Sequence, residues 1–315
     1  MIVHYAPRVL VIARPQVDWP ALTAAIGAPW RTDARTDAEA LCEAAGRECY
    51  ESFVAPRPGG NATYLRHILE SGHGSILEHA VWSLHLSGVS RACVTELLRH
   101  RAGLSPSMRS QRYCDEGVAA QVVAPPLRLA EIRGADAPAE PGRAADGRPP
   151  GVPAGDAADL AHAAATGRRW LDAQAAAFAA YRDEVAALTH KLTRDAYHRV
   201  CIKYAAAGLG CSDRDAWERE RDRADRTADR KAARGAARSL LPEATATRLV
   251  LSGNARAWRN VIEQRAASGA DAEIRRLAVA VHAALLPEAP ALFGDYTAEG
   301  LPDGSTALAT PYRKV

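Results

Sequence analysis

Aromatic side chains and an excess of either charge are both scarce in this sequence. Phe, Trp and Tyr make up 6% of its 315 residues, and the formal net charge is +3. Proteins that bind single-stranded nucleic acid use aromatic stacking or a continuous basic surface, so the composition disfavours that class. Positive charge is local and consists almost wholly of arginine, which favours a small anionic ligand over a nucleic acid.

Cysteine motifs are missing as well. No CxxC pair and no zinc-finger spacing with histidine occurs among the six cysteines, which are Cys42, Cys49, Cys93, Cys114, Cys201 and Cys211. The sequence does not open with a secretory signal pattern, and no apolar run reaches membrane-spanning length. From these absences we expect reduced thiols, a cytoplasmic location, no metal and no contact with a membrane.

The chain also lacks a βαβ rhythm and the GxGxxG motif, so a Rossmann domain is not predicted. With 48% hydrophobic and 24% charged residues the composition is that of an ordinary globular protein. The length allows one large domain or two ordinary ones, and we predict a single domain over residues 1–315. Between about residues 125 and 158, Pro, Gly, Ala and Asp dominate without an apolar period, which indicates a surface loop or insertion.

Apolar spacing and capping residues predict the elements around this insertion. Strands are expected over residues 9–13, 79–86 and 245–251. Helices are expected over residues 36–49, from Asn61 as N-cap to 71, from Ser90 as N-cap to 98, from about 160, over 194–207, within the charge-rich stretch 213–238, over 254–264 and over 272–286.

The most basic stretch follows the helix that begins at Ser90. Residues 99–113 (RHRAGLSPSMRSQRY) contain four arginines, one histidine and three serines but no carboxylate. Guanidinium groups at this density cannot all be buried without partners, so anions from outside are the expected partners. Arginine is suited to phosphate or an imide edge because it donates two parallel hydrogen bonds. The helix end and the loop beyond it are therefore a candidate binding site.

Residues 72–79 (GHGSILEH) form a second polar stretch. Two histidines and a glutamate occur here, but the spacing is not HExxH, and we predict no metal site. Ser75 and Glu78 instead have the S-x-x-E spacing of a capping box, which would close a turn with polar groups directed at a ligand.

A third stretch extends from Arg238 to Arg265. It contains Asn254 and Arg256 at the start of an expected helix and Asn260 on the body of that helix. Either Asn254 or the preceding Ser-Gly pair can cap the helix. For any one of these stretches, capping or surface charge would be a sufficient explanation, but three stretches with the same residue types favour a shared site.

Taken together, these stretches resemble the flavin-dependent thymidylate synthase family. The family signature is Arg-His-Arg, seven residues, then Ser; here residues 99–101 are Arg-His-Arg, and residues 110–113 are Ser-Gln-Arg-Tyr. The GHGS motif with Glu78-His79, the Ser-Arg-Ala-Cys segment at 90–93, Cys49-Tyr50 and the series from Arg238 to Arg265 also match. The resemblance covers about residues 36–125 and 160–290.

The resemblance implies an α+β fold, a helix-flanked sheet that assembles as a homotetramer. It implies a methyltransferase that places a methyl group on C5 of a uridylate (UMP or dUMP). The carbon would come from 5,10-methylenetetrahydrofolate and the reducing equivalents from NADPH through FAD. A second implied possibility is a homologue that has lost catalysis and binds only flavin or nucleotide.

The resemblance also implies roles for individual positions. Arg265 matches the catalytic residue, which would stabilise negative charge on the uracil imide. Flavin-binding positions would be His73, Ser75, Glu78, Arg99, His100, Arg101, Asn254, Arg256 and Asn260. Nucleotide-binding positions would be Glu96, Arg99, Ser110, Gln111, Arg112, Arg238 and Arg265.

Some positions depart from the family pattern. Eight residues, one more than usual, separate Arg101 from Ser110. Met108 stands where the family usually has Glu or Gln. Glu96 replaces a common Gln, and Gly269 replaces a frequent His. These departures bear on the nucleotide, because an offshoot of the family in nucleoside-antibiotic biosynthesis, such as the polyoxin pathway, methylates UMP. We hypothesise that the additional residue makes room for a ribose 2′-hydroxyl.

Overall fold

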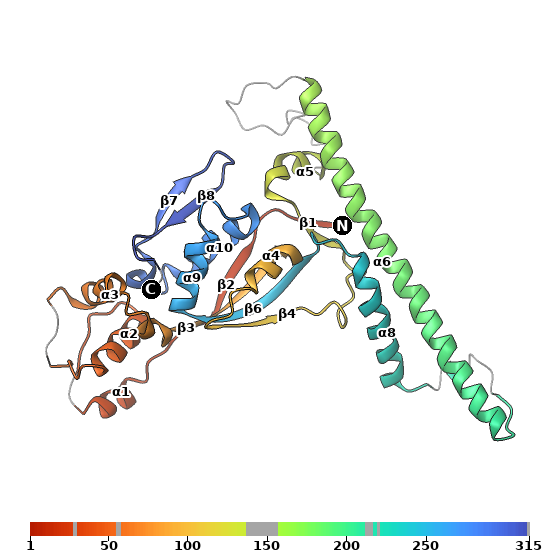
Figure 1. Cartoon of the computed structure of the whole chain (residues 1–315), viewed down its shortest axis with the longest axis horizontal. Helices are drawn as coiled ribbons and strands as arrows, with labels where there is room; N and C mark the ends of the chain where they lie inside the picture. The colour runs from red at the N-terminus through yellow and green to blue at the C-terminus, as the bar shows by residue number, and fades with distance from the viewer. Residues whose placement is uncertain (28–29, 55–57, 137–156, 212–216, 219–220, 314–315) are drawn as a thin grey trace. The chain divides into compact units, whose positions relative to one another are not determined.

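The computed structural model of the chain describes residues 1–27, 30–54, 58–136, 157–211, 217–218 and 221–313 (Figure 1). Its internal contacts divide the chain into two compact units. Unit 1 comprises Met1–Val3, Arg109–Ala124 and Arg128–Thr245, and unit 2 comprises His4–Met108, Pro125–Leu127 and Ala246–Val315. The single catalytic domain inferred from the sequence stays a prediction.

Unit 2 is built on a four-stranded antiparallel sheet. Its strands, in spatial order, are β2 (Arg8–Ala13), β3 (Val81–Ser90), β6 (Ala246–Asn254) and β4 (Leu104–Met108). Leu84 of β3 lies opposite Leu251 of β6, and Leu86 lies opposite Leu249. Since side chains alternate along a strand, these leucines share one face of the sheet. The strands predicted over residues 9–13, 79–86 and 245–251 are confirmed, with β3 beginning at Val81.

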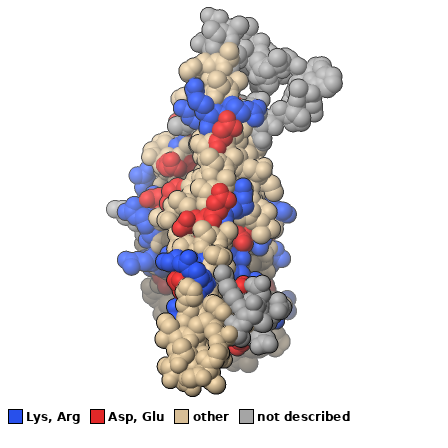
Figure 2. Space-filling view, turned by 90° about the vertical axis from the view of Figure 1, so that its right-hand side faces the viewer, with Lys and Arg blue, Asp and Glu red and all other residues tan. Residues whose placement is uncertain are grey.

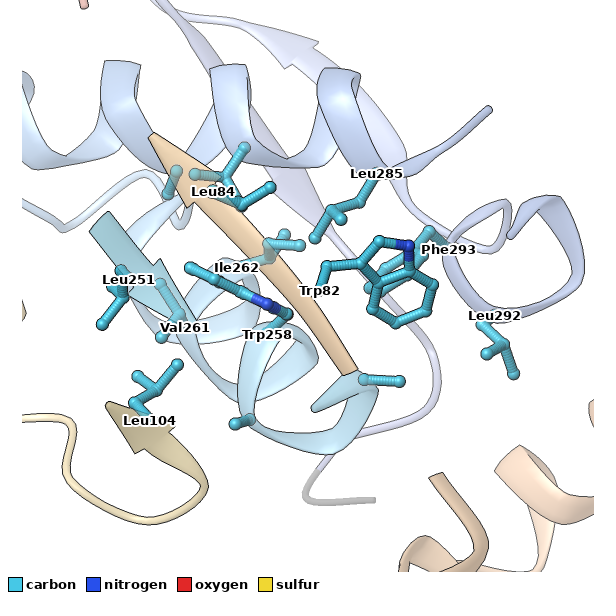
Figure 3. Packing of buried hydrophobic residues seen from close by; sticks show 14 of the residues in the cluster. Trp82, Leu84, Leu104, Leu251, Trp258, Val261, Ile262, Leu285, Leu292 and Phe293 are labelled. Carbon is cyan, nitrogen blue, oxygen red and sulfur yellow. The ribbon is translucent and has the colours of Figure 1, made fainter. Parts of the chain in front are cut away.

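The core of unit 2 lies between this face and two helices, α9 (Ala255–Arg265) and α10 (Ala272–Leu285). Figure 3 shows Trp82 of β3 beside Phe293, and their rings meet edge to face with centroids 5.8 Å apart. Trp258 of α9 is also fully buried. Truncating an aromatic side chain in such a core typically costs about 3–5 kcal/mol of stability. The packing therefore fixes α9, which carries several of the predicted site residues.

Further helices and a hairpin complete unit 2. They are α1 (Trp19–Ile26), α2 (Asp37–Glu48), α3 (Gly60–Glu70), η1 (Gly74–Glu78), α4 (Arg91–Leu97), α11 (Pro290–Phe293), β7 (Thr297–Gly300) and β8 (Thr306–Ala309). The prediction that Asn61 caps α3 is wrong, because Gly59 is the N-cap. The Asn61 amide is buried and donates to Glu43 Oε2 at 2.8 Å, so it joins α3 to α2 instead.

Unit 1 is mainly helical. Its elements include β5 (Gln121–Val123), paired with β1 (Ile2–His4), then α5 (Leu129–Asp136), α6 (Ala157–Ala206), α8 (Arg223–Ala237) and η3 (Arg238–Leu240). The short η2 (Pro126–Arg128) precedes α5 and lies mostly in the Pro125–Leu127 segment of unit 2. Helix α6 packs against α5 and α8. The two helices predicted from about 160 and over 194–207 are one helix of 50 residues. No Pro or Gly interrupts its sequence after Gly167, which explains the continuity.

The stretch predicted as a surface loop at 125–158 is partly helical. Helix α5 forms within it, and Ile132 is completely buried, which gives this short segment an apolar anchor. Residues 137–156 lie outside the described residues. In the charge-rich stretch 213–238, the helix begins only at Arg223, and Ala233 and Ala237 are buried, so one of its faces is not solvated.

The expectation that all thiols are reduced is wrong for two cysteines. Cys201 and Cys211 form a disulfide. Gly208 has a φ of +69°, which is accessible to glycine, and Leu209 N–H donates to Tyr204 O at 2.8 Å. This turn brings the chain back to the end of α6 and so brings the two cysteines together.

Among the residues that the structure describes, none of the helices has the length and the apolar character needed to cross a bilayer. Figure 2 shows the face that is on the right-hand side of the view in Figure 1. On this face, Lys and Arg side chains are interspersed with Asp and Glu, and a continuous basic stripe is not seen in its described part. The location in the cytoplasm stays a prediction.

Candidate functional site

Helix α4 is short, and its first turn is fixed by another helix. Ser90 Oγ accepts the Cys93 N–H at 3.0 Å, so the predicted cap is confirmed. Glu273 of α10 accepts hydrogen bonds from the Ser90 N–H at 2.8 Å and from its hydroxyl at 2.7 Å. Burial raises the pKa of Glu273 despite these two bonds. The sequence offers no signal for this contact, because 183 residues separate the two partners.

The other end of α4 presents the Arg-His-Arg motif. Arg99 N–H donates to Glu96 O and His100 N–H donates to Leu97 O, at 3.3 and 3.1 Å, so both residues continue the last turn of the helix. Arg99 is exposed and His100 is half-buried. The charged residues therefore begin on a helix end whose position is set by the core.

Gly103 turns the chain immediately after the motif. Its φ is +69°, and a Cβ atom here would lie 2.9 Å from Asn254 Nδ2. The Gly103 carbonyl accepts the Asn254 N–H at 3.3 Å. A glycine is therefore required both for the backbone conformation and for the close approach to Asn254.

The segment after Gly103 is not the loop that the sequence predicted. Leu104–Met108 forms β4, an edge strand, and Pro106 is tolerated there because an edge strand has one unpaired side. Pro and two serines give a weak strand signal, which explains the missed strand. Met108 ends β4, and Arg91 Nη1 donates to its sulfur at 3.3 Å.

Four side chains of unit 2 form a compact charged cluster beside the motif. Arg265, the last residue of α9, donates from Nε to His100 Nε2 at 2.8 Å. Its Nη2 lies 3.4 Å from Glu96 Oε2. The same carboxylate oxygen lies 3.3 Å from Arg99 Nη1. We refer to Glu96, Arg99, His100 and Arg265 as the Arg265 cluster.

Two amides of α9 border this cluster. His100 Nε2 accepts from Arg265, and the other ring nitrogen, Nδ1, faces the Asn260 amide at 3.5 Å. Gln264 donates to Asn260 Oδ1 at 2.6 Å. Which amide atom faces the ring is an assignment from the hydrogen-bond network. The i,i+4 spacing of Asn260 and Gln264 is the signal that could have predicted this pair.

His100 is expected to stay neutral at lower pH than an ordinary histidine. Burial and the charges of Arg265 and Arg99 lower its pKa from 6.5. A lowered pKa means that the folded state binds fewer protons than the unfolded state. This contribution to stability is present above about pH 6.5 and is lost as the pH falls through the lowered pKa. An NMR titration of the His100 ring should give a midpoint below 6.5, and a midpoint at or above 6.5 would contradict the geometry.

A second group of predicted residues lies around the start of α9. Asn254 Oδ1 accepts the Ala257 N–H at 2.8 Å, so Asn254 is the helix cap. Arg256 forms an exposed ion pair with Glu78 at 2.7 Å. The capping box predicted for Ser75 and Glu78 is wrong, because Ser75 lies within η1 and Glu78 pairs with Arg256.

The remaining predicted positions of unit 2 are exposed. His73, Ser75 and Arg101 all present their side chains to solvent. Helix α9 packs against η1, so the 72–79 stretch and the start of α9 lie in one region of unit 2. Across the described residues, no group of three or more His, Cys, Asp and Glu side chains is arranged to hold a metal ion.

The other four predicted positions belong to unit 1. Ser110 Oγ accepts the Arg112 N–H at 3.3 Å, Gln111 is buried, and Arg112 and Arg238 are exposed. The side chain of Arg112 lies against Gly235 of α8, where a Cβ would meet its Nε at 3.5 Å. Unit 1 therefore brings the Ser-Gln-Arg segment beside α8, which ends at Ala237.

Two neighbouring contacts in unit 1 were not predicted. Arg109 pairs with Glu116 at 2.5 Å, which anchors the start of the Ser-Gln-Arg segment. Lys231 lies over the Tyr113 ring, with Nζ 4.2 Å from its centroid, and donates to the phenol oxygen. The hydrogen bond from Lys231 lowers the pKa of Tyr113. Lys231 lies within the charge-rich stretch, 118 residues from Tyr113, so the sequence gives no signal for their contact.

The donor set around α9 is suited to an anionic cofactor. Arg99, Arg101 and Arg256 are exposed cations, and the positive end of the α9 dipole lies beside Arg256. Arginine and the N-terminus of a helix are the groups that bind phosphates. The Arg265 cluster adds a half-buried guanidinium with hydrogen-bond donors left for an anion.

The chain is similar to known proteins along most of its length. The sequence model of the family described as "Thymidylate synthase complementing protein" matches residues 32–291. The flavin-dependent thymidylate synthase of Mycobacterium sp. (strain JLS) is 40% identical over 307 residues, which cover 96% of this chain and 95% of the relative. That of Mycobacterium marinum is 39% identical over 285 residues, which cover 90% of this chain and 89% of the relative.

Solved structures show the same fold. The UMP/dUMP methylase PolB from Streptomyces cacaoi bound with 5-Br UMP aligns with a TM-score of 0.50 at 18% identity, over 93% of this chain and 95% of that chain. The structure bound with 5-Br dUMP aligns with a TM-score of 0.51 at 17% identity, over 93% and 96%. The predicted α+β class without a Rossmann domain is confirmed.

Proposed function

Because this chain belongs to the flavin-dependent thymidylate synthase family, we propose that it methylates C5 of a uridylate nucleotide. Membership in this family makes it a flavin-dependent methyltransferase. The finer parts of the proposal are FAD as the flavin, 5,10-methylenetetrahydrofolate as the carbon donor and NADPH as the reductant. The observation that carries the proposal is the Arg265 cluster, which assembles the family's Arg-His-Arg motif with the arginine at the end of α9.

The flavin is assigned to the positions around α9 and η1. FAD carries a diphosphate, and the exposed Arg99, Arg101 and Arg256 with the N-terminus of α9 form a donor set of matching charge. His73, Ser75, Glu78, His100, Asn254 and Asn260 complete the proposed set. When bound, the flavin supplies the reducing equivalents for the reaction.

Arg265 is proposed to bind the uracil edge. C5 becomes nucleophilic when negative charge is spread over N3, O2 and O4, and a guanidinium stabilises such charge at every working pH. His100 receives the Arg265 Nε–H, which fixes the orientation of the guanidinium. The half-buried site of Arg265 strengthens this electrostatic effect relative to water.

In unit 1 we propose Ser110, Gln111, Arg112 and Arg238 as nucleotide-binding positions, and in unit 2, separately, Arg99. Arg112 and Arg238 are exposed cations. The Ser110 hydroxyl lies next to Arg112, because it accepts the Arg112 backbone N–H. Removing one such charge-assisted contact costs about 1.5–3 kcal/mol of binding. Folate and the nucleotide are the proposed small-molecule partners.

A homotetramer is also proposed. One face of the unit 2 sheet is packed by α9 and α10, whereas Leu10 and Ile12 of β2 and Val81 of β3 are 41%, 53% and 46% exposed. Apolar side chains gathered at a sheet edge are typical of surfaces that a partner covers. Identical subunits in closed symmetry are the common partners of such surfaces.

The choice between UMP and dUMP is the part of the proposal that an experiment decides. Purified protein is supplied with FAD, NADPH, methylenetetrahydrofolate and either nucleotide under anaerobic conditions, and the product mass is measured. A gain of one methyl group on either nucleotide is the expected result. Methylation of UMP would support a role in nucleoside-antibiotic biosynthesis and the 2′-hydroxyl hypothesis, whereas methylation of dUMP alone would refute that hypothesis. Flavin binding without any product would favour the non-catalytic homologue and contradict the proposal.

A further inference from the structure

We propose that Glu96 is a positioning residue that holds Arg265 and Arg99 in place, rather than a group that contacts the nucleotide. The inference rests on the proposed function, since it assigns a role to a residue of that site. The sequence placed Glu96 among the nucleotide-binding positions, and its contacts point to a different task.

The geometry of Glu96 is that of a bridge between two guanidinium groups. A single oxygen, Oε2, lies 3.3 Å from Arg99 Nη1 and 3.4 Å from Arg265 Nη2. Arg99 and Glu96 belong to one turn at the end of α4, whereas Arg265 is the last residue of α9 and lies far away in the sequence. Glu96 therefore ties the end of α4 to the end of α9 through side chains.

The charges of the cluster explain why a carboxylate is useful there. Arg99 and Arg265 repel each other, and His100 beside them is held neutral by burial and by their charges. With Glu96 the cluster has two positive charges and one negative charge; with a neutral residue it would have two uncompensated positive charges. The carboxylate thus offsets the repulsion between Arg265 and Arg99, so that Arg265 can keep its hydrogen bond to His100.

Direct contact with an anionic nucleotide is disfavoured for the same residue. A carboxylate has no proton to donate at neutral pH, so it would repel a phosphate or an ionised imide. Arg265 remains able to bind such an anion, because its contacts with described residues occupy two of its five N–H donors, one facing His100 and one facing Glu96. Three donors are left, and a bidentate contact needs two.

The test uses Glu96→Ala and Glu96→Gln in the full-length protein, with Glu131→Ala and Glu131→Gln as the matched controls. Glu131 also pairs with an arginine three residues away, Arg128, at 2.7 Å, but outside the site. We expect Glu96→Ala to lower kcat roughly ten- to a hundredfold, because Arg265 loses the carboxylate that holds it, whereas Glu96→Gln keeps an acceptor oxygen and should lower kcat less. The KM for the nucleotide should stay within about threefold, because no nucleotide contact is lost. The two Glu131 variants should leave both constants unchanged.

An NMR titration of His100 gives a second readout that does not require turnover. The charge of Glu96 raises the pKa of His100, whereas burial and the two arginines lower it. Glu96→Gln should therefore move the His100 midpoint to lower pH, and Glu131→Gln should leave it in place. A raised KM with unchanged kcat, or an unmoved His100 midpoint, would overturn the proposal. Absence of product with the unaltered protein would count against the proposed function, while the titration would still test Glu96.

Discussion

Replacing Arg265 by alanine is expected to lower kcat for uridylate methylation by roughly a hundred- to a thousandfold, as does removal of one preorganised donor in other enzymes. Arg265 is the only residue of the site that the structure holds through both a ring nitrogen and a carboxylate, His100 Nε2 and Glu96 Oε2, among the described contacts. Its loss removes the charge that stabilises the developing anion on the uracil. Steady-state kinetics with the preferred nucleotide measure the effect.

The control for this variant is Arg128→Ala. Arg128 is also partly exposed and pairs with a glutamate, but it lies outside the proposed site. It should retain full activity. Arg265→Lys adds a sharper test, because lysine keeps the charge but lacks the planar fork that donates to His100 and to an imide together. Recovery of most activity in Arg265→Lys would contradict bidentate binding of the imide.

The parts of the site that could be predicted from the sequence are those with local signals. Ser90 and Asn254 are helix caps because each side chain accepts a backbone N–H three residues on. The Arg-His-Arg motif lies at the end of the helix that Ser90 caps, so its position follows from that cap and the helix length. These features depend on residues close together in the chain, so a single sequence contains them.

The parts that could not be predicted depend on partners far away in the chain. Glu273 fixes α4 through Ser90, and Glu96 reaches Arg265, each across more than 160 residues. Strand β4 forms by antiparallel pairing with β6, although its own sequence contains Pro106. Pairing of Cys201 with Cys211 requires the glycine turn at the end of α6, which cysteine spacing alone does not specify. Tertiary context decided each of these outcomes.

Replacing Arg259 by methionine is expected to lower the free energy of unfolding by about 3–5 kcal/mol, because it leaves a buried carboxylate without its partner. Arg259 of α9 is 2% exposed. It donates from Nη1 and Nη2 to the two oxygens of Asp295 at 2.6 and 2.9 Å, and from Nη2 to Thr310 Oγ1 at 3.4 Å. Urea denaturation of both proteins measures the difference.

Two further variants separate the ion pair from general packing. Arg14→Met breaks a pair of similar geometry with Glu288, at 2.8 and 3.0 Å, but Arg14 is 62% exposed. It should cost less than about 1 kcal/mol. In the double variant Arg259→Met with Asp295→Asn, the loss should be smaller than the sum of the single losses, because no uncompensated charge remains. Strict additivity would contradict a direct interaction between Arg259 and Asp295.

The pH dependence of the free energy of unfolding provides a further test of the Arg259–Asp295 ion pair. Burial alone would raise the pKa of Asp295, but hydrogen bonds and the charge of Arg259 outweigh it and hold the pKa below 3.8. The native protein therefore keeps this contribution above about pH 4 and loses it as the pH falls through the lowered pKa. In Arg259→Met the hydrogen bonds and the charge of Arg259 are lost while the hydrogen bond from Thr310 remains, so the pKa of Asp295 should be higher than in the native protein. Acidification below about pH 4 should therefore shrink the stability difference between the native protein and Arg259→Met, whereas the difference between the native protein and Arg14→Met should stay small throughout.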